Sequence, residues 1–152
     1  MTLIREATEA DLPRLMELLY QLSQVGERPQ AAVGAVEDSQ RAALRELQSS
    51  EESTCLVLER DGQVVGTITL YVLPALSHGG RPFGLIENVV VDETARQTGL
   101  GRQLMDAAER LARQKGCYKV SFTSNQRRTD AHAFYERLGY RATHRGFSKY
   151  FD

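Results

Sequence analysis

The fold is decided by residues 85–123, which read LIENVVVDETARQTGLGRQLMDAAERLARQKGCYKVSFT. The β-branched run Leu85–Val91 is typical of a strand that is covered on both faces. A helix is predicted next, because apolar residues recur at helical spacing before Gly116, at Leu100, Leu104, Ala108 and Leu111. Tyr118–Thr123 then alternates as a second strand. This order predicts a right-handed crossover between two parallel strands.

The remaining elements flank this unit. Asp61-Gly62 is a common two-residue hairpin turn and separates strands expected at Thr54–Glu59 and Val64–Val72. Further elements are expected as a strand at 2–7, helices at 12–22, 38–48 and 130–138, and two short strands around Gly146. The sequence thus predicts one α+β domain over residues 1–152, with three α/β/α layers. Its mixed, mostly antiparallel sheet is expected to hold the parallel pair at its centre.

Composition describes an ordinary globular chain of 152 residues, with 41% hydrophobic and 26% charged residues. Its two cysteines lie in apolar segments, so neither a disulfide framework nor a metal site is expected. No stretch is long and apolar enough to span a bilayer, and we expect a cytoplasmic protein without a membrane partner.

Charge is divided unevenly along the chain. The first half, residues 1–76, carries six Arg against twelve acidic residues, whereas residues 77–152 carry ten Arg and three Lys against eight. The second half is therefore the place to seek an anionic ligand, although a solvated surface explains the asymmetry equally well. The excess is too mild and too poor in aromatic residues to predict a nucleic-acid partner.

The loop Arg96–Arg102 lies between the first strand of the crossover and the first turn of its helix. Unpaired helix amides, the helix dipole and two glycines predict a cradle for a pyrophosphate. A P-loop would need Lys-Ser/Thr after the second glycine, and a dinucleotide fingerprint would need a third glycine. Glycines that merely tighten the turn remain an alternative.

Two spaced signatures resemble the GNAT superfamily of N-acetyltransferases. Arg96 to Gly101 matches Arg/Gln-x-x-Gly-x-Gly/Ala, and Asn125 followed by Ala131 to Tyr140 is similar to Asn…Ala-x-x-Phe-Tyr-x-x-x-Gly-Phe. Residues 4–12 also resemble the first strand and helix of the family. Within it, the cofactor half of the chain is similar to glucosamine-6-phosphate N-acetyltransferases.

The resemblance implies acetyl coenzyme A (acetyl-CoA) as the acetyl donor. The backbone of the preceding strand would pair with the pantetheine arm, and Asn125 would hydrogen-bond that arm or, equally, cap a helix. The residues implied in cofactor binding are Val89, Val90, Val91, Arg96, Gln97, Thr98, Gly99, Leu100, Gly101, Arg102 and Asn125.

Two residues are expected to be catalytic in direct transfer to a primary amine. Tyr135, where the family has its tyrosine, would protonate the leaving sulfur. Glu87 would take a proton from the acceptor ammonium, or instead anchor the acceptor or pair with an Arg. His78 and Arg81, in a Gly-rich loop, are candidate acceptor contacts or ordinary loop residues.

The expected acceptor is the amine of a small molecule, such as an amino-sugar phosphate, a polyamine, an amino acid or an amine drug. Protein amino groups are one alternative, and a non-catalytic module that binds acyl-CoA as a regulatory ligand is another. The resemblance also implies a possible homodimer.

Overall fold

The structure is a computed structural model that describes residues 1–26 and 34–152. By its internal contacts the chain divides into two units, Met1–Phe122 and Thr123–Asp152. The strands and helices of the first unit are β1 (Thr2–Glu6), α1 (Leu12–Ser23), α2 (Asp38–Ser49), β2 (Ser53–Arg60), β3 (Gln63–Leu73), β4 (Phe83–Val91), α3 (Leu100–Gln114) and β5 (Val120–Ser121). The second unit holds α4 (Thr129–Arg137).

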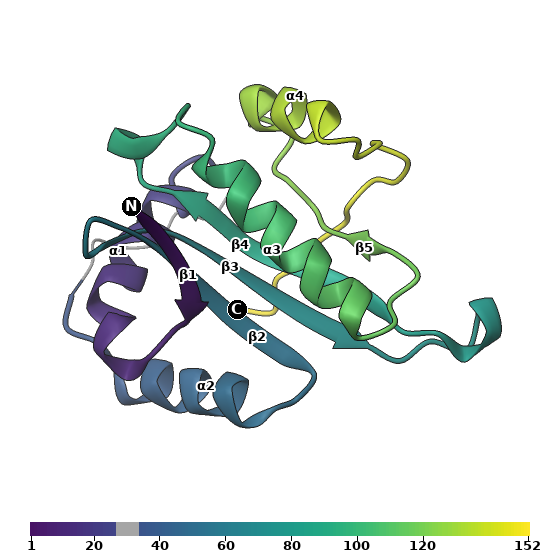
Figure 1. The fold of residues 1–152 in the computed structure, drawn as a ribbon, viewed down its shortest axis with the longest axis horizontal. Coiled ribbons are helices and arrows are strands. Elements are labelled where there is room, and N and C mark those ends of the chain that lie inside the picture. The colour runs from purple at the N-terminus through teal and green to yellow at the C-terminus, as the bar shows by residue number, and fades with distance from the viewer. Residues whose placement is uncertain (27–33) are drawn as a thin grey trace. The chain divides into compact units, whose positions relative to one another are not determined.

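The first unit is a five-stranded sheet in the order β1-β2-β3-β4-β5 (Figure 1). Its first four strands are antiparallel to their neighbours and β5 is parallel to β4, so the mixed sheet and its parallel pair are confirmed. The pair lies at an edge rather than at the centre. The physical reason is that residues 141–152, where two more strands are expected around Gly146, contain no strand.

The hairpin between β2 and β3 forms as its turn chemistry predicts. Asp61 and Gly62 have φ angles of 52° and 81°, the pair of left-handed residues that a type I′ turn requires. The amide of Asp61 also donates to the Met1 carbonyl at 3.1 Å, which fastens β1 beside the turn. This hairpin sets the register of the central strands.

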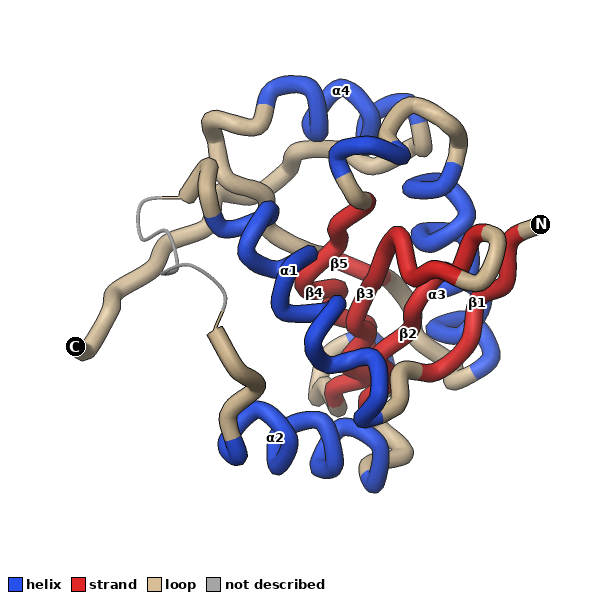
Figure 2. Tube along the Cα trace, turned by 90° about the vertical axis from the view of Figure 1, so that its left-hand side faces the viewer, coloured by secondary structure: helices blue, strands red, loops and turns tan. Residues whose placement is uncertain are grey.

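The sheet separates two cores, with α1 on one side and α3 on the other (Figure 2). On the first side, buried residues from α1, α2 and the sheet include Leu15, Leu18, Leu44, Val57 and Val90. On the other side, α3 buries its apolar stripe at Leu104, Met105, Ala108 and Ala112. The predicted three layers are thereby confirmed within this unit.

Close packing of side chains from the neighbouring strands explains one glycine of β4. A Cβ at Gly84 would meet side-chain atoms of Val120 in β5 at 2.9 Å and of Leu70 in β3 at 3.1 Å. Any side chain there would displace these two neighbours, so glycine permits the close packing.

Candidate functional site

A bulge in β4 sets the direction of its side chains. Thr67 pairs with Val90 and Thr69 pairs with Glu87, so three steps along β4 oppose two steps along β3. Within the extra length, Asn88 has a φ of 55°, a left-handed conformation that asparagine tolerates better than most residues. The bulge therefore puts Glu87 and Val90 on the same face, although three positions separate them.

The Glu87 side chain is half-buried on this face, opposite the buried Thr69. Burial raises the pKa of its carboxyl group. In the described part of the chain, no Arg or Lys forms a salt bridge with it, so the expected alternative of an Arg partner finds no support here. The carboxylate has the environment of a base.

Tyr71 is a neighbour of Glu87 that the sequence analysis missed. It follows Thr69 by two positions on β3 and therefore lies on the same face as Glu87. Burial raises the pKa of its hydroxyl, and the negative charge of Glu87 raises it further. The alternation of β3 shows that Tyr71 shares a face with Thr69, but only the register places both beside Glu87.

The outer edge of β4 is largely free of a neighbouring strand. Within the described sheet, β5 pairs with β4 only at Gly84 and Leu85. The edge from Ile86 to Val91 therefore offers backbone groups of the kind that an extended ligand binds by adding a strand. Of these, the Val91 carbonyl accepts a hydrogen bond from Arg96 Nε at 3.1 Å.

The segment after β4 forms an exposed loop that ends at the first turn of α3. Gln97 and Gly99 have φ angles of 62° and 80°. Residues 96–99 are exposed, whereas Leu100 is buried in the core. A Cβ added at Gly99 would have no heavy atom within 4 Å, so the loop is open to solvent. Exposed amides at a helix N-terminus suit a pyrophosphate, while the side chain of Leu100 serves packing.

Two arginines, Arg96 and Arg102, and the hydroxyl of Thr98 also lie at this loop. Arg102 is exposed and lies 3.8 Å from Asp106, one turn further along α3. Thr98 Oγ1 donates to the Ala95 carbonyl at 2.6 Å, so the hydroxyl of Thr98 closes the loop. The loop therefore has an exposed arginine on α3 with only a long ion pair to Asp106, a second arginine that donates to the backbone of β4, and a hydroxyl that is hydrogen-bonded within the loop.

In the second unit, Asn125 organises the turn before α4. Its Oδ1 accepts from the Arg127 amide at 2.9 Å, and its carbonyl accepts from the Arg128 amide at 3.0 Å. His132 Nε2 also lies 2.9 Å from that carbonyl. Asn125 therefore forms a local turn and does not cap α4, whose N-cap is Arg128, so the expected cap is not formed and the role in cofactor binding stays a prediction.

Tyr135 is buried on α4, where only 7% of its surface is exposed. Its ring packs against Phe134 at 5.3 Å and against Tyr140 at 6.3 Å between ring centroids. Burial raises the pKa of the hydroxyl, while the charge and hydrogen bond of Arg128 act in the opposite direction. The phenol is therefore protonated at neutral pH, as an ordinary tyrosine is and as a proton donor requires.

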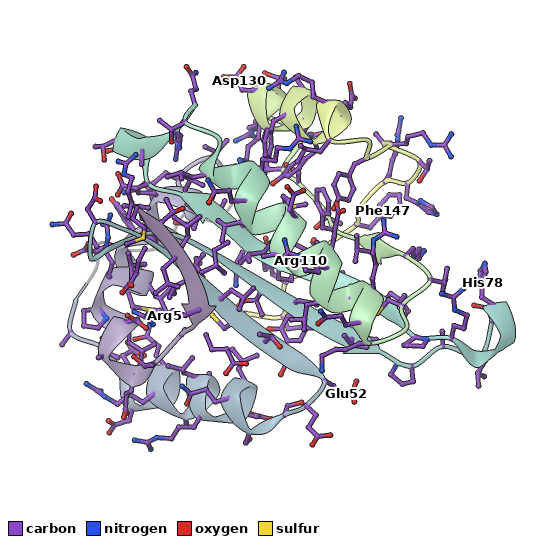
Figure 3. All side chains as sticks on the ribbon, in the orientation of Figure 1. Arg5, Glu52, His78, Arg110, Asp130 and Phe147 are labelled. Carbon is purple, nitrogen blue, oxygen red and sulfur yellow. The ribbon has the colours of Figure 1, made fainter. Side chains whose placement is uncertain are left out.

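His78 and Arg81 lie before the start of β4, whereas the loop at 96–99 follows its end. The ring of His78 stacks on Tyr118 at 4.0 Å, and Arg81 Nη2 donates to the Cys117 carbonyl at 3.4 Å. Figure 3 shows His78 projecting beyond the end of the sheet. The structure does not bring these two residues to Glu87.

The described residues contain neither a cluster of metal-binding side chains nor a membrane-spanning helix. No group of three or more His, Cys, Asp and Glu side chains there has the arrangement of a metal site. None of the helices in this part of the chain has the length and apolar character needed to cross a membrane.

Comparison with known proteins gives the same assignment as the motifs. A family model described as the acetyltransferase (GNAT) family matches residues 14–140. The chain is 35% identical over 143 residues to a glucosamine 6-phosphate N-acetyltransferase of Trypanosoma brucei brucei, which covers 93% of this chain and 90% of that protein. It is 40% identical over 90 residues to an aminoalkylphosphonate N-acetyltransferase of Salmonella typhimurium, which covers 59% of this chain and 58% of that one.

A solved structure shares the whole fold. The crystal structure of a transcriptional regulator from Bacillus halodurans C-125 superposes with a TM-score of 0.87 at 29% identity, and covers 99% of this chain and 100% of that one. The family model and the full-length relative agree with the two signatures in the sequence. The chain therefore belongs to the GNAT family and is an N-acetyltransferase.

Proposed function

We propose that this chain transfers the acetyl group of acetyl-CoA directly to the primary amine of a small molecule. One observation carries the proposal: β4 joins the half-buried carboxylate of Glu87, which forms no ion pair with the residues that the structure describes, to the exposed loop at residues 96–99 and the first amides of α3. A proton acceptor and an anion cradle on one strand are the parts that acetyl transfer to an ammonium requires.

The donor is held by the loop and by the strand edge. Exposure, positive φ angles and open space at Gly99 support pyrophosphate binding there. The free β4 edge supports pairing with the amide groups of the pantetheine arm. Acetyl-CoA supplies an acetyl thioester, whose carbonyl carbon is activated for attack by an amine. The proposed binding residues are Val89, Val90, Val91, Arg96, Gln97, Thr98, Gly99, Leu100, Gly101, Arg102 and Asn125; Val90 and Leu100 act through their backbone because their side chains are buried.

Glu87 is the proposed base. It takes one proton from the acceptor ammonium, directly or through water, and so frees the nitrogen lone pair to form the new C–N bond. The second proton of that nitrogen passes to solvent as the tetrahedral intermediate collapses to the amide. Its raised pKa favours this uptake, because a buried carboxylate gains by becoming neutral.

Tyr135 is the proposed acid. As the C–S bond breaks, its hydroxyl donates a hydrogen bond or its proton to the leaving sulfur, and solvent returns the proton. Its protonated state at neutral pH and the family signature around it support this role.

We propose that the acceptors are small primary amines. Amines that carry a phosphate or phosphonate group are the preferred candidates. Two relatives are named for such compounds, glucosamine 6-phosphate and aminoalkylphosphonates. His78 and Arg81 lie beyond the start of β4, and Phe83 precedes Glu87 by four residues, about 13 Å along a strand. We therefore limit their proposed contact to the distal part of a long acceptor.

The alternative of a non-catalytic module that binds acyl-CoA as a regulatory ligand has less support, because the family model and the two relatives are named as acetyltransferases. One similar structure is named as a transcriptional regulator. Both functions predict binding of coenzyme A, and only the enzyme predicts turnover. Acetylation of protein amino groups remains the alternative for the acceptor.

The proposed enzyme is a single domain, located in the cytoplasm and assembled as a homodimer. The family model spans 14–140 and so includes parts of both units, which supports one acetyltransferase domain over residues 1–152. Both cysteines are free thiols, which suits the cytoplasm. A homodimer is also proposed, and light scattering during size-exclusion chromatography tests it.

The deciding experiment measures release of free thiol from acetyl-CoA with a panel of amines. The panel contains glucosamine 6-phosphate, an aminoalkylphosphonate, a polyamine, an aminoglycoside and a peptide with a free amino terminus. Mass spectrometry identifies the acetylated product, and the same amines without protein are the control. Binding of coenzyme A without turnover on any amine would favour the regulatory module.

A further inference from the structure

A buried carboxylate, Asp92, stands where β4 ends and the loop begins. Its side chain accepts four hydrogen bonds, and only 5% of the residue is exposed. Thr94 donates two of them, from its amide at 2.8 Å and its hydroxyl at 2.5 Å. The other two come from α1, from Arg14 Nη2 at 2.5 Å and from Gln21 Nε2 at 3.2 Å. Asp92 therefore joins the loop to a helix from a distant part of the sequence.

Arg14 and Gln21 each hold a second group near this point. Arg14 Nε donates to the Val64 carbonyl at 2.9 Å, at the start of β3. Gln21 Oε1 accepts from the Glu93 amide at 3.1 Å. The two side chains are about two helical turns apart and so share one face of α1. Two successive loop residues are thus fastened to the same helix face.

This anchor precedes the anion cradle directly. Ala95 is fully buried, and its carbonyl accepts from Thr98. The left-handed residues Gln97 and Gly99 follow, and α3 fixes the other end. The path of the exposed amides is therefore determined by α3 at one end and by the α1 contacts at the other.

We infer that Arg14 and Gln21 are positioning residues for the cofactor: through Asp92 and Glu93, they set the loop amides that bind the pyrophosphate of coenzyme A. This inference rests on the proposed function of the loop. It assigns to α1 a role in donor affinity, and Arg14 precedes Asp92 by 78 residues. Hydrogen bonds from Thr94, Arg14 and Gln21 hold the pKa of Asp92 well below its usual range, so the link persists across the working pH range.

The test measures the affinity for coenzyme A by calorimetry in Arg14→Gln, Gln21→Leu and the double variant. Each single change removes one anchor, and we expect Kd to rise about tenfold for Arg14→Gln and about threefold for Gln21→Leu. Glu17→Gln is the matched control, because Glu17 is the exposed partner of Arg14 and does not contact the loop. It should leave Kd within about twofold of the wild type.

A measurement other than stability distinguishes a positioning role of Arg14 and Gln21 from a purely structural one. Circular dichroism first confirms that each variant is folded, and kinetics then compare the two substrates. We expect KM for acetyl-CoA to rise more than KM for the amine, with a smaller change in kcat. Arg14→Lys retains one donor for Asp92 but loses the bond to Val64, so it should recover part of the affinity.

The outcomes separate this inference from the proposed function. If the wild-type protein binds no coenzyme A, the proposed function fails. If the wild type binds and the folded variants match its Kd while only their melting temperatures fall, the α1 contacts are merely structural and this inference is overturned.

Discussion

Gly99 offers the most direct test of the anion cradle. Its φ of 80° makes any other residue strained there, at a cost of about 1–2 kcal/mol. An added Cβ meets no atom within 4 Å, so no clash adds to that strain. For a protein of this size, the cost corresponds to a fall in melting temperature of roughly 3–8 °C. Gly99→Ala, Gly99→Asn and Gly99→Glu should therefore all fold, and Asn should lose least because it tolerates this conformation.

Only Gly99→Glu adds charge. A carboxylate about 5 Å from one phosphate charge, at an effective dielectric of about 20–40, costs about 1.7–3.3 kcal/mol. This corresponds to a loss of affinity for coenzyme A of roughly 15- to 250-fold relative to Gly99→Ala.

Calorimetry with coenzyme A compares the three variants at low salt, and a repeat at high salt should narrow the difference because exposed charges are screened. Gly99→Glu binding as tightly as Gly99→Ala would show that the pyrophosphate lies elsewhere.

Three further predictions concern single side chains. Glu87→Gln should lower turnover mainly below the pKa of the acceptor amine and recover part of it at high pH, where solution has already deprotonated the amine; a pH–rate profile checks this, and an equal loss at every pH would assign Glu87 to positioning. Tyr135→Phe should lower kcat by about 10²- to 10⁴-fold, if thiolate departure limits the rate, with little change in Kd for acetyl-CoA; unchanged kcat with weakened binding would make Tyr135 a binding residue. The hydrogen bond from Arg5 is the main cause that lowers the pKa of Asp11 to about 2. The ionised Asp11 therefore contributes about 2 kcal/mol to the free energy of unfolding above pH 4, and this contribution is lost as the pH falls through 2. Denaturant titrations should therefore show Asp11→Asn less stable by about this amount at pH 7, with the difference shrinking towards pH 2; a difference that stays constant with pH would contradict the ion pair.

Elements with local signals were predictable from the sequence. The hairpin formed at Asp61-Gly62 because its turn chemistry acts over two residues. The helical spacing of apolar residues was also enough to predict α3, since its single apolar stripe packs against a single sheet. Each of these two signals lies within one short stretch of the chain.

The pairing of strands was harder to predict from the sequence. Tyr118–Thr123 alternates as a six-residue strand would, yet only Val120 and Ser121 pair with β4. Alternation reports which side chains are covered, whereas pairing depends on the neighbouring backbone. For the same reason the prediction of two strands around Gly146 was wrong, because residues 141–152 contain no strand.

The α1 anchor had no signal in the sequence. Arg14 and Gln21 stand on the polar side of an amphipathic helix, where charged and amide residues are common. Their contact with Asp92 depends on how α1 crosses the end of β4, which no local pattern encodes. The sequence also predicts a loop over Val25–Val36, with Gly26, Pro29 and Gly34, and most of this stretch lies outside the described residues.

The bulge at Asn88 decides the face on which the proposed base lies. Without the extra residue, Glu87 and Val90 would lie on opposite faces of β4. Val90 belongs to the core on the α1 side, so Glu87 would then point into the apolar layer beneath α3. A carboxylate there would lie on the apolar face that α3 covers rather than beside Thr69 and Tyr71. The run Leu85–Val91 hides this shift, because a strand covered on both faces has no alternation that could reveal it. One left-handed asparagine, seen only in the structure, therefore places Glu87, the proposed base, on the face of Thr69 and Tyr71.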